Sequence, residues 1–124
     1  NETLIALMGA MHMSLLGPEG LQHLATRNMA ASTQLKRQLS ELKSVHLPYA
    51  SQCHFNEFVI ELPAATSECL TYLEGDGVIG GFDVSQWYPE KTNQMLLSVT
   101  DQTSQQDIDR LIQSLSNWTK EVNA

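Results

Sequence analysis

The sequence predicts an α+β fold, in which a small and mostly antiparallel sheet carries helices on one face. Two observations predict it. Long segments near both ends carry apolar residues at helical spacing, and the two clearest strand segments, 55–62 and 95–100, are separated by one short helix and by loops. A chain of 124 residues is long enough for one domain with a single hydrophobic core.

Residues 4–16 form the first predicted helix. Apolar residues recur in it at spacings of three and four, which places on one face Leu4, Leu7, Met8, Met11 and Leu15. A row of methionines can form an adaptable binding surface, but core or interdomain packing is far more common. We therefore expect this face to pack in a core or against another domain.

A second helix is predicted from Pro18 to about Leu42. Gly17 suits the end of one helix and Pro18 the first turn of the next. The apolar face of this helix is weaker in its small and polar middle, residues 28–34.

The strongest strand signal lies in residues 55–62, where Phe58, Ile60 and Leu62 alternate with other side chains, so that one face should be buried. Residues 45–49 are a weaker candidate because Pro48 cannot donate to a ladder.

Helices are predicted after each of the two clear strands. Thr66 or Ser67 should cap the first, with Leu70 and Leu73 facing inward and the glycine turn 75–77 ending it. The last helix begins near Thr103, which forms a capping-box pattern with Gln106. Its predicted apolar stripe consists of Ile108, Leu111, Ile112, Leu115, Trp118 and Val122.

Composition excludes several functional classes. The formal charge is −7 and the basic residues are scattered, which argues against a nucleic-acid partner. No stretch approaches the ~20 apolar residues of a membrane span. Cys53 and Cys69 have no CxxC spacing, so we expect reduced thiols in a cytosolic protein. The chain begins with Asn1, without a signal peptide, and is expected to be a piece of a longer protein.

No self-contained catalytic, metal or cofactor site is predicted. The four histidines lie in different predicted elements, and no nucleophile elbow is present. The glycine-rich stretch 77–81 fits neither a dinucleotide fingerprint nor a P-loop. A Schiff-base lysine needs a buried site, and solvated positions are expected for Lys36, Lys43, Lys91 and Lys120.

Four residues are candidates for the edge of a site that a neighbouring domain would complete: Asn56, Gly80, Gly81 and Tyr88. The two glycines indicate either a turn where backbones approach closely or a flexible edge that reaches an active site. Asn56, beside Glu57, indicates either a substrate cleft or the wet face of a half-exposed strand. Tyr88 is either an interface aromatic or a hydroxyl at the edge of the site.

Three ordered stretches carry a resemblance to a known family. They are Ser14–Leu21, then Phe55–Val59 with Leu62-Pro63, then Gly77–Gly81 with Tyr88–Glu90, Leu97–Asp101, Thr103 and Ile108–Leu111. In this order they resemble the C-terminal part of the glycine-decarboxylating P-protein family of the glycine cleavage system, in its subunit 1 form. Ser98 and Asp101 depart from the Cys and Glu of the family pattern, so the resemblance assigns that strand no catalytic role.

The resemblance implies a fold-type-I pyridoxal-phosphate enzyme whose small C-terminal domain closes over the active site. Such an enzyme, an oxidoreductase of the bacterial cytoplasm, decarboxylates glycine and passes the aminomethyl group to the lipoyl arm of the H-protein. Subunit 2 would supply the cofactor lysine. Residues 1–124 would be the C-terminal domain, with the two helices of 1–42 packed on a large domain and an α+β core in 43–124.

Two other functions remain open: the small domain of another fold-type-I enzyme, or a free-standing ferredoxin-like binding module. Under the P-protein interpretation, residues 1–124 alone should bind no pyridoxal phosphate and should be inactive. The uncovered apolar face of residues 4–16 should favour self-association.

Overall fold

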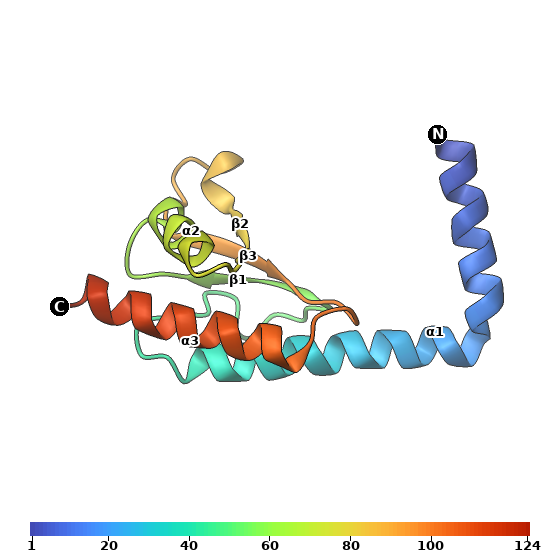
Figure 1. The fold of residues 1–124 in the computed structure, drawn as a ribbon, viewed down its shortest axis with the longest axis horizontal. Coiled ribbons are helices and arrows are strands. Elements are labelled where there is room, and N and C mark those ends of the chain that lie inside the picture. Colours follow the sequence, from blue (N-terminus) through green and yellow to red (C-terminus); the bar gives the residue numbers. More distant parts are fainter.

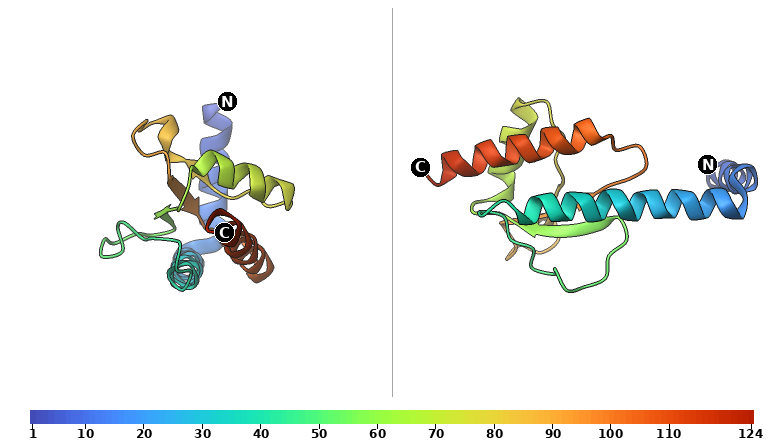
Figure 2. Two further views of the ribbon diagram at one scale, coloured as in Figure 1. Left: turned by 90° about the vertical axis from the view of Figure 1, so that its left-hand side faces the viewer. Right: turned by 90° about the horizontal axis from the view of Figure 1, so that it is seen from below.

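The computed structural model describes all residues from Asn1 to Ala124. Its elements are, in order, α1 (Glu2–Ser40), β1 (Glu57–Glu61), α2 (Thr66–Gly75), β2 (Phe82–Asp83), the 3-10 helix η1 (Val84–Gln86), β3 (Gln94–Ser98) and α3 (Gln105–Val122) (Figure 1). The sheet has the order β1-β3-β2, and both pairs are antiparallel. Two views show α2 and α3 on one side of the sheet and the loop after α1 on the other (Figure 2). The predicted α+β class is confirmed.

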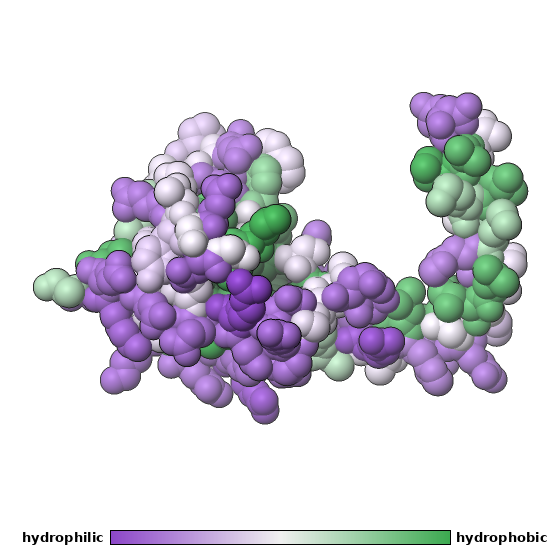
Figure 3. All heavy atoms as spheres, in the orientation of Figure 1, coloured by the Kyte–Doolittle hydropathy of each residue, from purple (hydrophilic) through white to green (hydrophobic).

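The long helix α1 is broken at Gly17, as the sequence predicts. Gly17 has φ 63° and ψ −177°, a conformation that glycine adopts without the steric cost of a Cβ, and Pro18 follows it. Residues 2–16, here called the arm, project away from the rest of the molecule (Figure 1). The arm has no buried residue, and Figure 3 shows hydrophobic residues gathered over it.

By length and composition alone, α1 could also cross a membrane. An 18-residue window of it reaches a mean hydropathy of 1.2, and none of that window is buried. The prediction that no segment is long and apolar enough to span a membrane is therefore wrong for α1. An apolar helix that packs against another domain meets the same criteria.

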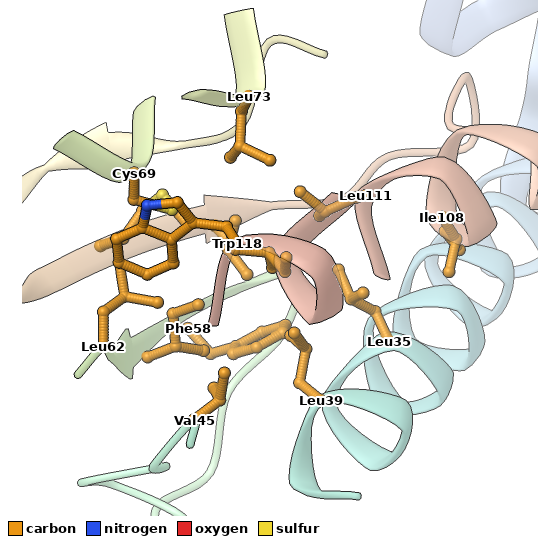
Figure 4. Close-up of a cluster of buried hydrophobic side chains, with 14 of the residues drawn as sticks. Leu35, Leu39, Val45, Phe58, Leu62, Cys69, Leu73, Ile108, Leu111 and Trp118 are labelled. Carbon is orange, nitrogen blue, oxygen red and sulfur yellow. The ribbon is translucent and has the colours of Figure 1, made fainter. Parts of the chain in front are cut away.

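A single hydrophobic cluster lies between the sheet and the helices (Figure 4). The inward-facing positions of β1, Phe58 and Ile60, are buried as the alternation predicts. They meet Leu39 from the second half of α1, Cys69 from α2 and Trp118 from α3. In α3, the stripe is buried at Ile108, Leu111, Leu115 and Trp118, whereas Ile112 is only partly buried and Val122 is exposed.

Three local predictions are wrong in detail. Residues 45–49 form only an isolated bridge between His46 and Glu61, since the chain turns from Pro48 onward. Neither Thr66 nor Ser67 caps α2: the cap is Ala65, without a side-chain bond, because the Thr66 side chain is buried instead. The α3 capping box lies elsewhere than at Thr103 and Gln106.

The observed box is formed by Ser104 and Asp107. The Ser104 hydroxyl accepts from the Asp107 amide at 3.2 Å, and the Asp107 carboxylate accepts from the Ser104 amide at 2.9 Å. Thr103, one residue earlier, has its hydroxyl occupied as the acceptor of the Thr100 amide, at 3.1 Å.

Candidate functional site

The carboxyl end of β3 brings together three of the four candidate residues. Asn56 precedes β1, and its carbonyl accepts from the amide of Val99 at 2.9 Å. Gly80 and Gly81 lie on the other side of β3, directly before β2, which pairs with β3 through Phe82 and Leu96. We call this end of the sheet the β3 edge. In Figure 1 it points toward the side of the molecule from which the arm rises.

Close packing accounts for both glycines at the β3 edge. A Cβ on Gly81 would lie 2.4 Å from the carbonyl oxygen of Leu96, and a Cβ on Gly80 would lie 2.6 Å from Cδ1 of Leu73. A side chain at Gly81 is therefore excluded by the backbone, whereas one at Gly80 would require the Leu73 side chain to shift. This supports the turn-and-packing interpretation of the pair, and a role toward an active site stays a prediction.

A pocket of about 440 Å³ opens beside the β3 edge. Its wall includes Gly80, Ser98 and Ile79, and the Ile79 side chain is 98% exposed. The two charged residues of its lining, Arg110 and Asp107, already have local partners. The Arg110 guanidinium donates to the carbonyl of Asp76 at 3.2 Å, and hydrogen bonds from Ser104 lower the pKa of Asp107. Arg110 thus links α3 to the end of α2 and Asp107 caps the start of α3, so both charged groups of the pocket already serve the fold.

Tyr88 does not join this group. It follows η1, near the opposite end of β3, where its carbonyl accepts from the amide of Lys91 at 2.8 Å. Its side chain is exposed, and the neighbouring Trp87 packs on Phe82 with ring centroids 4.4 Å apart. The structure thus separates Tyr88 from Asn56 and the glycines.

Two of the four lysines differ from expectation. Lys43 and Lys120 are exposed, but Lys36 and Lys91 are half-buried. The ammonium of Lys36 donates to the carbonyl of Ala50 at 3.2 Å and lies 3.4 Å from Nδ1 of His54. Sequence reasoning missed this contact because it depends on how the loop after α1 folds back, for which Lys36 itself gives no signal.

No lysine of this chain is fully buried, whereas a Schiff-base lysine needs a buried site. Lys36 is held at the surface of the sheet by a carbonyl and an imidazole, and Lys91 lies in a loop. Cys69 is fully buried, and burial raises the pKa of its thiol to about 12, which removes it as a nucleophile. Cys53 is exposed, and no group of three His, Cys, Asp or Glu side chains could hold a metal.

Comparison with known proteins identifies the family. The family described as "Glycine cleavage system P-protein" matches residues 1–115. The chain belongs to the P-protein family. Among its curated relatives, "Probable glycine dehydrogenase (decarboxylating) subunit 1" of Dictyoglomus turgidum is 32% identical over 97% of this chain, and that of Thiobacillus denitrificans is 33% identical over 93%. The chain spans about a quarter of these relatives, 26% of each.

Solved structures agree on the fold. A glycine decarboxylase (P-protein) of the glycine cleavage system, in inhibitor-bound form, matches with TM-score 0.80 and 31% identity over 90% of this chain and 25% of its own. A NifS-like protein and a phosphoserine aminotransferase from Cytophaga hutchinsonii match with TM-scores of 0.65 and 0.62. At 14% identity, these two show the shared fold alone.

Proposed function

We propose that this chain is the C-terminal domain of subunit 1 of a bacterial, cytoplasmic glycine-decarboxylating P-protein. The whole enzyme would decarboxylate glycine with pyridoxal phosphate and pass the aminomethyl group to the lipoyl arm of the H-protein, with subunit 2 as its partner. One observation carries the proposal: the match to a solved P-protein over 90% of this chain combines a TM-score of 0.80 with 31% identity.

The lysines of this chain indicate which part of the enzyme would hold the cofactor. Pyridoxal phosphate supplies an electron sink for decarboxylation when it is bound to a lysine. Because no lysine of this chain occupies a suitable site, the cofactor would be held by other parts of the enzyme. The role left to this domain is to cover and shape the site.

The arm is the proposed attachment to the remaining part of the subunit. Its apolar residues are exposed, and such a surface favours contact with another domain. The relatives can provide that domain, because this chain spans only 26% of their length. We place residues 1–42 against that large domain and residues 43–124 as the α+β core. Leu35 and Leu39, however, belong to the core, so the contact would be made chiefly by the arm.

The β3 edge is the proposed rim of the active site. Asn56 flanks this end of β3 on one side and Gly80 and Gly81 flank it on the other, next to a pocket that Gly80 lines and on the side of the arm (Figure 1). Tyr88 lies away from this edge, so we propose for it an interface role.

Isotope exchange tests the proposal. The full-length subunit, together with its partner subunit and H-protein, should exchange labelled CO2 with the carboxyl group of glycine. No exchange by the complete set would contradict the proposal. Turnover of another amino acid by the subunit alone would instead favour a different fold-type-I enzyme.

A further inference from the structure

The outer face of the sheet, opposite α2 and α3, holds a second pocket. Its volume is about 220 Å³. Val59 and Leu96, which are partners in the β1–β3 register, form its apolar floor. The loop after α1 folds over this floor and contributes Tyr49 and His54. Figure 2 shows that loop on the side of the sheet away from α3.

Lys36 gives this pocket a positive wall. An ammonium group has three N–H donors and no acceptor. Two of its neighbours are the carbonyl of Ala50, at 3.2 Å, and Nδ1 of His54, at 3.4 Å. Both neighbours are uncharged acceptors, so one of the three N–H donors of Lys36 has no partner in the protein. No anion neutralises the positive charge of this half-buried side chain.

His54, which also lines the pocket, carries a second unsatisfied donor. Because Lys36 can only donate, Nδ1 of His54 accepts, and the proton of a neutral ring lies on Nε2. Nε2 is buried and has no hydrogen-bond partner. A buried donor in this state costs ~1–3 kcal/mol. The edge-to-face contact of His54 with Phe58, at 5.5 Å between centroids, fixes the ring against the sheet but supplies no conventional acceptor.

Charge and size together select the ligand. The lining supplies an apolar floor and donors, and the one carboxylate at its rim, Glu57, is exposed. The volume of 220 Å³ falls below the ~300–1,000 Å³ of pockets for drug-sized molecules. From these observations we propose that the pocket binds a small carboxylate with a short apolar body, the carboxylate on Lys36 and the apolar body on Val59 and Leu96. This site is separate from the β3 edge and does not depend on the proposed function.

Nuclear magnetic resonance on isotope-labelled chain 1–124 tests the proposal, with butyrate as the probe and butanamide as its uncharged counterpart. Butyrate should shift the methyl signals of Val59 and Leu96 and the imidazole signals of His54 saturably, in the millimolar range. Butanamide should bind at least tenfold more weakly, because it lacks the charge that Lys36 would neutralise. Equal binding of the two probes, or no saturable shift, would overturn the proposal.

Two variants and one control localise the site. Lys36→Gln should weaken butyrate binding at least tenfold, and Leu96→Trp should block it by filling the pocket while leaving the charge in place. Lys43→Gln, which removes an exposed lysine seven positions further on, should change nothing. Amide signal dispersion checks that each variant is folded. Unchanged butyrate affinity in a folded Lys36→Gln variant would refute the assigned role of Lys36.

Discussion

The two halves of α1 differ more in their surroundings than in their sequence. Both carry leucines at helical spacing, yet Leu39 is 0% exposed in the core and Leu15 is 85% exposed on the arm. The half after Gly17 meets the sheet and α3, whereas the arm meets nothing in this chain (Figure 1). An apolar helix face therefore indicates that something covers it, but the cover can lie outside the chain that carries the helix.

The largest expected difference between the halves is the cost of removing a leucine. Leu39→Ala should lower the free energy of unfolding by about 2–5 kcal/mol, because it leaves a cavity in the core. Leu15→Ala should change it by less than about 0.5 kcal/mol, since the side chain is exposed. Urea unfolding of the two variants measures both values. Similar losses in the two variants would show that the arm is part of the cooperative unit.

Two glycines sharpen the comparison. Gly81→Ala should destabilise the chain by about 2–3 kcal/mol, because the new Cβ would meet the Leu96 carbonyl and the pairing of β3 would have to shift. Gly9→Ala on the arm has no atom within 4 Å of its new Cβ. It should leave the unfolding midpoint unchanged and raise the helical circular dichroism signal, because alanine favours a helix by up to about 1 kcal/mol. A destabilised Gly9→Ala variant would contradict a free arm.

At neutral pH the smallest expected effects come from the thiols, whose contribution appears only as the pH rises. Cys69 is buried with a pKa raised to about 12, so its ionisation is delayed in the folded state. The unfolded chain loses this proton first, near ~8.5, and stability should therefore be complete below that pH and fall as the pH rises toward 12. Cys69→Ser should reduce this alkaline loss. A thiol reagent at neutral pH should modify exposed Cys53 at once and Cys69 only after unfolding; immediate modification of both would contradict the burial.

Sequence patterns predicted the elements whose signal is local. The alternation in β1, the stripe of α3 and the break at Gly17 each follow from residues a few positions apart. The predictions failed where a distant contact decided the outcome. Thr66 is drawn into the core and leaves α2 without a side-chain cap, and Lys36 is held by a loop that begins after its own helix. The candidate site shows the same limit: nothing in the sequence placed Asn56 and the two glycines on either side of the same end of β3, or separated Tyr88 from them.

Hydrogen exchange tests most directly whether the arm is covered in the parent subunit. In chain 1–124, amides of residues 2–16 should exchange with little protection, while those of β1 and β3 should exchange only through global unfolding. In the full-length subunit the same arm amides should become protected to a similar degree as the sheet. Equal and low protection of the arm in both proteins would contradict the account, because the arm would then have no partner in the P-protein.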